Sequence, residues 1–295
     1  SMAELAKLVR DAGAGIASLT LDSNGIFGVL PDGWGDGAEP DKFVSEMQPL
    51  LDALKVSSIS SLSLKSTGMG AQGVTALVDA IRAMAVIARL AIGSNQIGDE
   101  AMINLLDALK DISLTSLDIS ETGSGVSTAT KLAELLSADC KFTAVIVSIN
   151  CLANKFGEEG LSTLLASIKD TSVRSLCGLI EGQTVADFSG QNLGPIDCKI
   201  MAAEFAFQGF IAVITSANLL HNPLGEGVHE IIEVFEQKEQ LRTLCGFEEG
   251  IKEIDWKDSK KGPTEILLLA ADLRACRAIA VLASLTISGV FTRVT

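Results

Sequence analysis

Aliphatic residues recur along this chain at a spacing that predicts short strands. One aliphatic is followed three positions later by a second and two positions after that by a third, and a polar residue then closes the segment, as in Ile87, Leu90, Ile92 and Asn95. Because alternate side chains of a strand point to the same face, the last two aliphatics face one core. The triplets are Ile16, Leu19, Leu21; Ile59, Leu62, Leu64; Ile87, Leu90, Ile92; Leu114, Leu117, Ile119; Ile146, Ile149, Cys151; Gln183, Ala186, Phe188; Ile214, Ala217, Leu219; Ile251, Ile254, Trp256; and Leu282, Leu285, Ile287.

The stretches between the triplets have the spacing of amphipathic helices. Met102, Leu105, Leu106 and Leu109 lie at i, i+3, i+4 and i+7, which is one face of a helix. The repeating unit is therefore a short strand, a turn and a helix. Strands that are all joined through helices run parallel, so we expect an α/β fold with a parallel sheet on one face and helices on the other. Because a helix is wider than a strand, such a stack is expected to curve into a horseshoe with the sheet on its concave face.

The polar residue that closes a triplet has a predicted mechanical role. Asn24, Asn95, Asn154 and Asn222 occupy this position. An amide there can bond to the backbone groups of the adjacent turn, which the sheet leaves without partners. We interpret these asparagines as structural residues.

Units such as Leu90-x-Ile92-x-x-Asn95-x-Ile97-Gly98-Asp99-Glu100 resemble the leucine-rich repeats of the ribonuclease-inhibitor type, which also occur in NOD-like receptors. The resemblance extends from about residue 14 to 290. It implies a leucine-rich-repeat solenoid whose concave sheet and adjacent loops bind other proteins. It implies no catalytic residues.

These patterns predict one leucine-rich-repeat domain over residues 1–295, with a capping helix at 1–13, about nine repeats over 14–290 and an inserted loop at 27–42. The inserted loop is rich in glycine and proline and delays the expected helix. It also carries Trp34. That side chain either anchors a partner from an exposed loop or packs on the N-terminal cap.

A second irregularity is a motif that occurs twice. Residues 173–182, VRSLCGLIEG, resemble residues 241–250, LRTLCGFEEG, which lie 68 positions later. Each copy precedes a strand without the usual leucines. We expect each to be a loop inserted between a helix and a strand, on the same edge of the solenoid. The glycines do not indicate a phosphate site, because no Lys-Ser or Lys-Thr follows and acidic residues dominate.

The residue between the second and third aliphatics of each triplet should project from the concave face. Asp118, Asn150, Asp187, Asn218 and Asp255 hold this position in five successive triplets. Strands pair about 4.8 Å apart, so we expect an acidic stripe across five adjacent strands. Such a stripe can accept arginine or lysine side chains from a partner, or it can be a hydrated surface without a ligand. The candidate binding residues are Asp118, Glu121, Asn150, Asp187, Asn218, His221, Glu253, Asp255 and Asp258 on the concave face and Trp34 on the loop.

The formal net charge of −14 bears on the choice of partner. An acidic surface repels phosphate backbones, so nucleic acid is an unfavourable partner and a basic protein is electrostatically favoured. The apolar runs are too short to predict a membrane span. No pair of cysteines is spaced as CxxC, and the six cysteines are expected to be free thiols in a reducing cytoplasmic environment.

Catalytic chemistry has little support in the sequence. His221 and His229 are the only histidines, and two histidines with scattered acids do not make a zinc site. Asp187 and Asp255 have no evident acid–base partner. We therefore expect no enzyme activity, no metal and no cofactor.

The sequence favours an intracellular protein–protein interaction scaffold that binds through the acidic concave face and the edge loops. One alternative is a structural subunit of a larger assembly. Another is a regulator of small GTPases, because Ran GTPase-activating proteins use similar repeats, although their acidic tail has no counterpart here. The C-terminal strand region has no capping helix like that of the N-terminus. Since an open sheet edge is a liability, we expect another chain or further repeats to cover it.

Overall fold

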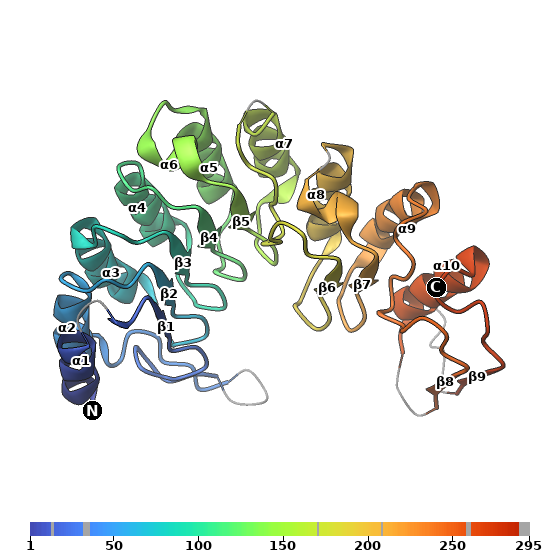
Figure 1. Cartoon of the computed structure of the whole chain (residues 1–295), viewed down its shortest axis with the longest axis horizontal. Helices are drawn as coiled ribbons and strands as arrows, with labels where there is room; N and C mark the ends of the chain where they lie inside the picture. Colours follow the sequence, from blue (N-terminus) through green and yellow to red (C-terminus); the bar gives the residue numbers. More distant parts are fainter. Residues whose placement is uncertain (13–14, 32–35, 170, 208, 258–260, 289–295) are drawn as a thin grey trace. The chain divides into compact units, whose positions relative to one another are not determined.

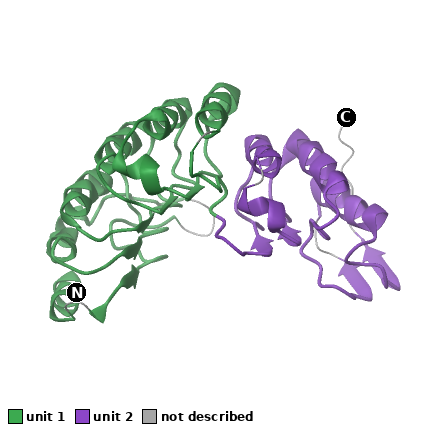
Figure 2. Ribbon diagram, turned by 45° about the horizontal axis from the view of Figure 1, so that its top comes forward, with its two compact units in different colours: residues 1–178 green, residues 179–295 purple. Residues whose placement is uncertain are grey.

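A computed structural model of the chain describes residues 1–12, 15–31, 36–169, 171–207, 209–257 and 261–288. The chain divides into two compact units, Ser1–Gly178 and Leu179–Thr295, which Figure 2 shows in different colours. We call them unit 1 and unit 2 and describe each by itself.

Unit 1 is an alternation of strands and helices. Its strands are β1 (Ser18–Thr20), β2 (Ser61–Ser63), β3 (Arg89–Ala91), β4 (Ser116–Asp118) and β5 (Ser148–Asn150). Its helices are α1 (Met2–Asp11), α2 (Val44–Leu54), α3 (Ala71–Ala83), α4 (Asp99–Leu109), α5 (Val126–Ser137), α6 (Lys141–Val145) and α7 (Gly157–Ser167). The five strands form one parallel sheet in the order β1-β2-β3-β4-β5, with the longer helices along one side of it (Figure 1). This confirms the predicted α/β fold with a parallel sheet, whereas a horseshoe built from leucine-rich repeats stays a prediction.

The register of this sheet follows the predicted aliphatic positions. Leu62, Leu90, Leu117 and Ile149 are paired strand by strand, and each is at most 1% exposed. Burying a side chain of this size contributes about 1.5–3 kcal/mol relative to leaving it in water. Each strand has only this one inward residue, so the column as a whole, rather than any single repeat, forms the core.

Asn95 joins two repeats through hydrogen bonds. Its Oδ1 accepts from the backbone N–H groups of Thr67 (2.9 Å) and Met69 (3.0 Å), which belong to the preceding repeat. Its Nδ2 donates to the carbonyl of Leu64 in that repeat (2.8 Å) and to that of Ile92 in its own (2.9 Å). The side chain of Asn95 is buried, so water could not supply these hydrogen bonds if the side chain were removed.

The same arrangement recurs at two further predicted positions. In unit 1, Asn154 accepts from the N–H of Thr122 (3.1 Å) and donates to the carbonyl of Ile119 (2.8 Å). In unit 2, Asn222 bonds in the same way to the preceding repeat, at Leu193 and Phe188. Asn24 lies in the first repeat, and its bonds to described residues stay within that repeat. The predicted structural role of these asparagines is confirmed, and three of them act across repeats.

Aspartates also link neighbouring helices in unit 1. Asp99, the first residue of α4, accepts hydrogen bonds from the N–H of Gly125 (2.7 Å) and of Thr128 (3.1 Å) at the start of α5. Asp41 does the same for α3 through Gly70 and Gly73. A carboxylate there accepts hydrogen bonds from N–H groups that have no partner within the helix. Its negative charge is also stabilised by the positive end of the helix dipole.

The inserted loop of unit 1 is described except for residues 32–35. Its described part folds back on itself, because Val29 and Glu39 form an antiparallel bridge, and α2 begins only at Val44. Phe27 is fully buried under it. Trp34 lies outside the described residues.

Unit 2 has two short sheets instead of one. Its strands are β6 (Val185–Asp187), β7 (Ser216–Asn218), β8 (Glu253–Trp256) and β9 (Ser284–Ile287). Its helices are α8 (Pro195–Ala206), η2 (Phe210–Val213), η3 (Gly225–Gly227), α9 (Val228–Gln237) and α10 (Pro263–Ala275). Among the described residues, β6 pairs only with β7 and β8 only with β9, both in parallel.

The motif that occurs twice accounts for this break. We call residues 174–178 elbow 1 and residues 242–246 elbow 2. In unit 1, elbow 1 pairs with β5: Ile149 donates to the carbonyl of Ser175 (2.8 Å), and Gly178 donates to that of Ile149 (3.1 Å). In unit 2, elbow 2 pairs with β7 in the same way, through Thr243 and Ala217. Each elbow therefore occupies the hydrogen-bonding edge that the next strand would otherwise use.

A glycine makes each elbow turn away after this pairing. Gly178 and Gly246 have φ of +76° and +70°, which disfavours residues with a Cβ. A Cβ on Gly178 would lie 2.8 Å from the Cβ of Asn150, and one on Gly246 would lie 2.8 Å from that of Asn218. The expected inserted loops are thus strand-like segments that end a sheet. The predicted acidic stripe across five adjacent strands is wrong, because those residues are divided among three sheets.

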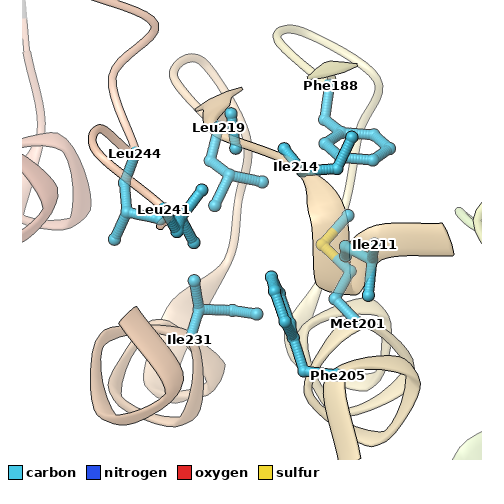
Figure 3. Close-up of a pocket in the computed structure, with 10 residues that line it drawn as sticks. Phe188, Met201, Phe205, Ile211, Ile214, Leu219, Ile231, Leu241 and Leu244 are labelled. Carbon is cyan, nitrogen blue, oxygen red and sulfur yellow. The ribbon is translucent and has the colours of Figure 1, made fainter. Parts of the chain in front are cut away.

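The core of unit 2 is less completely filled at β7. Ala217 stands where unit 1 has leucine or isoleucine, and an apolar cavity of about 10 Å³ remains beside it. Figure 3 shows Phe205 and Ile231 extending toward each other from two helices below this point. The cavity has room for about one water molecule and is lined only by apolar side chains, so it is not a site for a small ligand.

We predict that Asn95→Ala lowers the free energy of unfolding by at least about 3 kcal/mol, because it leaves several buried backbone groups unpaired. The matched control is Asn24→Ala, which removes the same residue type from an exposed position and should cost less than about 1 kcal/mol. Urea titrations of both variants measure this. Equal losses would contradict the cross-repeat role of Asn95.

The Asp99 cap predicts a pH dependence. Burial alone would raise the pKa of Asp99, but the hydrogen bonds from the Thr128 hydroxyl and from two backbone N–H groups outweigh it and lower the pKa below 3.8. A lowered pKa in the folded state means that the ionised cap stabilises fully above pH 3.8 and loses this effect as the pH falls through the folded-state pKa. In thermal melts at pH 7 and pH 3, the advantage of the native protein over Asp99→Asn should therefore shrink at the lower pH. A difference that is the same at both pH values would refute this.

Candidate functional site

The strand face opposite the helices of unit 1 is mostly uncharged. Its exposed or half-exposed positions are filled largely by small hydroxyl residues, together with one arginine: Ser18, Thr20, Ser61, Ser63, Arg89, Ala91, Ser116, Asp118 and Asn150. Of these nine side chains, only Arg89 and Asp118 carry a charge. The candidates predicted on this face of unit 1, Asp118 and Asn150, therefore contribute only one carboxylate to it.

The charge of Asp118 is compensated within unit 1. Its carboxylate lies 2.8 Å from Nζ of Lys65 and also accepts from the N–H (3.0 Å) and hydroxyl (2.6 Å) of Ser120. Lys65 comes from the turn after β2 and reaches past β3, where Ala91 and Gly93 are small. A Cβ on Gly93 would lie 3.0 Å from a carboxylate oxygen of Asp118. The ion pair thus depends on small residues in the intervening repeat.

The other two unit 1 candidates are also held locally. Glu121, with φ of +52°, accepts a hydrogen bond from Ser94 (2.7 Å). The side-chain oxygen of Asn150 accepts from the N–H of Leu152 (3.3 Å). Both side chains order the turns at the ends of their strands, which leaves them less free to bind a partner.

Unit 2 presents carboxylates of a different kind. Asp187, on β6, is exposed and accepts from the hydroxyl (2.7 Å) and the N–H (3.0 Å) of Ser189. These bonds, with a smaller contribution from Asn218 on β7, lower the pKa of Asp187 below 3.8. Asp187 and Asn218 are paired in the sheet, so this prediction of neighbouring acid and amide groups is confirmed. Asp187 is therefore an accessible carboxylate that stays ionised.

Two further carboxylates lie on β8. Glu253 and Asp255 alternate with the buried residues Ile254 and Trp256, so both face away from the helices. Asp255 accepts only from a backbone N–H, that of Lys257 (2.8 Å), among the described residues. None of the ion pairs between described residues involves Asp187, Glu253 or Asp255. These three carboxylates, which we call the acidic set, form no ion pair with another described residue.

His221 belongs to a separate contact in unit 2. It follows β7 with φ of +62°, and its Nε2 lies 2.9 Å from Nζ of Lys261. Lys261 also lies over the ring of Trp256, 5.1 Å from its centroid. Among the described residues, no carboxylate contacts His221 to orient it as a catalytic base. Asp258, the last predicted candidate, lies outside the described residues.

The cysteines and the remaining acids form no metal site in the part of the chain that the structure describes. All six cysteines are free thiols in the structure. Burial raises the pKa of Cys198 to about 12 and raises that of Cys245 as well, so neither is a reactive thiolate.

Asp272 is the residue that sequence reasoning missed. It lies on α10, is 1% exposed, and accepts from the hydroxyl of Thr243 (2.6 Å) and from the N–H groups of Leu244 (2.8 Å) and Cys245 (3.2 Å). Burial raises its pKa, and these three donors oppose that rise. Asp272 therefore fastens elbow 2 to the helix. An aspartate among the inward positions of an otherwise apolar helix was the signal for it.

No protein-family model matches the chain, and no curated protein matches it. Within the described residues, no helix is both long enough and apolar enough to cross a lipid bilayer. The surface chemistry of the two units is consequently the basis for a functional proposal.

We predict that Asp272→Ala destabilises unit 2 by about 2 kcal/mol or more, because it takes the acceptor from the buried N–H of Leu244 and from the hydroxyl of Thr243, and leaves the N–H of Cys245 only the Thr243 oxygen. Asp255→Ala, an exposed aspartate of the same unit, is the control and should change stability by less than about 0.5 kcal/mol. Hydrogen exchange of the Leu244 and Cys245 amides gives a local readout. Unchanged protection of these amides in Asp272→Ala would contradict the fastening role.

Proposed function

We propose that the chain is a leucine-rich-repeat solenoid that acts as a non-catalytic protein-binding scaffold, and that the acidic set of unit 2 binds a basic segment of its partner. The observation that carries this proposal is the contrast between two similar strand faces. The face of unit 1 has its aspartate paired with Lys65, whereas Asp187, Glu253 and Asp255 in unit 2 have no counter-charge among the described residues.

The physical reason is the cost of keeping such charges together without a partner. Exposed carboxylates on one face repel one another, and a cationic segment replaces that repulsion with attraction. An arginine suits the site best, because its planar guanidinium donates to both oxygens of a carboxylate. Neutral residues on the paired strands, Asn218 beside Asp187, Ser284 beside Glu253 and Thr286 beside Asp255, can donate or accept hydrogen bonds to the same segment.

The test compares two variants with the same change in net charge. The first is Asp187→Asn, Glu253→Gln and Asp255→Asn together. The control is Glu181→Gln, Glu239→Gln and Glu248→Gln together, which neutralises three exposed acids of unit 2 that lie outside its strands. Binding of a fluorescent arginine-rich peptide is measured by anisotropy at low and at physiological salt.

We expect the first variant to bind the peptide at least about tenfold more weakly, which corresponds to about 1.4 kcal/mol, and the control to lose about twofold or less. Equal losses in both variants would mean that the peptide senses only the net charge. That result, or the absence of binding to the native chain at physiological salt, would refute the proposal.

A further inference from the structure

The strand β9 of unit 2 has one paired and one open edge. Ser284 donates to the carbonyl of Lys252 (3.1 Å), so the backbone of Ser284 and Thr286 faces β8. Neighbouring residues of a parallel strand turn their backbone groups to opposite sides, so Leu285 and Ile287 offer theirs to the open edge. Among the described residues, no other strand pairs there.

The side chains at this edge are apolar and exposed. Leu285 and Ile287 are 40% and 39% exposed, and Leu273 of α10 is 37% exposed. No charged residue occurs between Ala278 and Ser288. Open edges are usually protected by charged residues, and this one has none.

The chain repeats with a period of 68 residues, so this surface can be compared with the equivalent surface one period earlier. The motif repeats after 68 residues, and so do the strands: β5, β6, β7, β8 and β9 begin at residues 148, 185, 216, 253 and 284. The positions 68 residues before Leu273, Leu285 and Ile287 are Phe205, Ala217 and Leu219. Those three are only 4%, 7% and 2% exposed.

The cover over the earlier three residues is the next repeat of the same unit. Ile231 of α9, Leu241 just before elbow 2 and Leu244 within it line the same cavity as those three residues (Figure 3). The surface of β9 and α10 is therefore equivalent to the surface of β7 and α8. There, the next repeat of the chain covers it.

Among the described residues, β1 of unit 1 pairs only with β2, so its other edge is open. Ser61 donates to the carbonyl of Ala17, and Leu21 donates to that of Ser63, so the backbone of Ala17, Leu19 and Leu21 faces β2. The backbone groups of Ser18 and Thr20 then face the open side. No charged residue occurs from Ile16 to Leu21, and Leu19 and Leu21 remain partly exposed, whereas their counterparts in β2, Leu62 and Leu64, are 1% exposed.

The two open edges match as neighbouring strands do inside unit 1. There, the earlier strand pairs through its inward aliphatic residues, such as Leu19, and the later strand through its outward residues, such as Ser61 and Ser63. On β9 the free backbone groups belong to the inward residues Leu285 and Ile287. On β1 they belong to the outward residues Ser18 and Thr20.

We propose that two copies of this chain associate head to tail, with β9 of one copy pairing in parallel with β1 of the next. The contact buries Leu285 and Ile287 against the partly exposed aliphatics of β1. It is heterologous, so it leaves one open edge at each end of a pair and leads to longer arrays or closed rings at higher concentration.

The experiment is sedimentation equilibrium of the whole chain from about 1 to about 200 µM, a range that detects micromolar association. Leu285→Lys places a charge on the open face of β9. Thr20→Pro removes an N–H from the open edge of β1 without removing one that faces β2. The control is Val213→Lys, which places the same charge at an exposed aliphatic residue of η2, away from both edges. Circular dichroism melts confirm that each variant is folded, and Ile287→Lys and Ser18→Pro replace any variant that is not.

We expect the average mass of the native chain and of Val213→Lys to rise above 30.8 kDa with concentration. Leu285→Lys alone and Thr20→Pro alone should stay monomeric. A mixture of the two should form pairs and nothing larger, because each variant retains the edge that the other lacks.

Three results would overturn the proposal. A native chain that stays monomeric throughout the range shows that the edges do not pair. Self-association of Thr20→Pro shows that two β9 strands pair with each other instead. A mixture that stays monomeric shows that the two edges do not fit each other.

Discussion

The structure depends on hydrogen bonds that each repeat supplies to its neighbour. A three-residue strand cannot satisfy the turn that follows it, and the asparagine of the next repeat does so. Asn95 holds backbone groups of the repeat before it, and Asn154 and Asn222 do the same further along. Because these groups are buried, a repeat without its neighbour would leave them unpaired. Stability is therefore a property of adjacent pairs of repeats, as expected for a linear stack.

The elbows interrupt this dependence and replace it with another. Each ends a sheet by occupying the edge of the strand before it, so the strand after it begins a new pair. Elbow 2 is then fixed by the carboxylate of Asp272 on the following helix, and the inward position of β7 is reduced to Ala217. A buried carboxylate is costly unless its oxygens are satisfied, and here three donors converge on it. In unit 2 this buried acid therefore adds a second link between repeats to the one that Asn222 makes.

The sequence predicted the strands, the inward aliphatics and the role of the asparagines well. These features recur at the same place in each repeat, so the spacing along the sequence reveals them. The division into separate sheets was not predicted, because the spacing of the aliphatic residues does not show that the elbows, rather than the next strands, pair with β5 and β7. The ion pair of Lys65 and Asp118 was not predicted either. Its two residues lie two repeats apart, and the register of the strands brings them together. Of the candidate residues, Asp118 is paired with Asn150 in one sheet and Asp187 with Asn218 in another.

The two proposed contacts use different parts of the same strands. A basic partner would meet the side chains of Asp187, Glu253 and Asp255, which point away from the helices. A second copy would meet the backbone edge of β9 and the aliphatic side chains that point toward them. Since successive side chains of a strand face opposite ways, the charged surface and the apolar one are separated by the strand itself. Binding of a partner to the acidic set would also reduce repulsion between copies that each carry a net charge of −14, so the two contacts should reinforce each other.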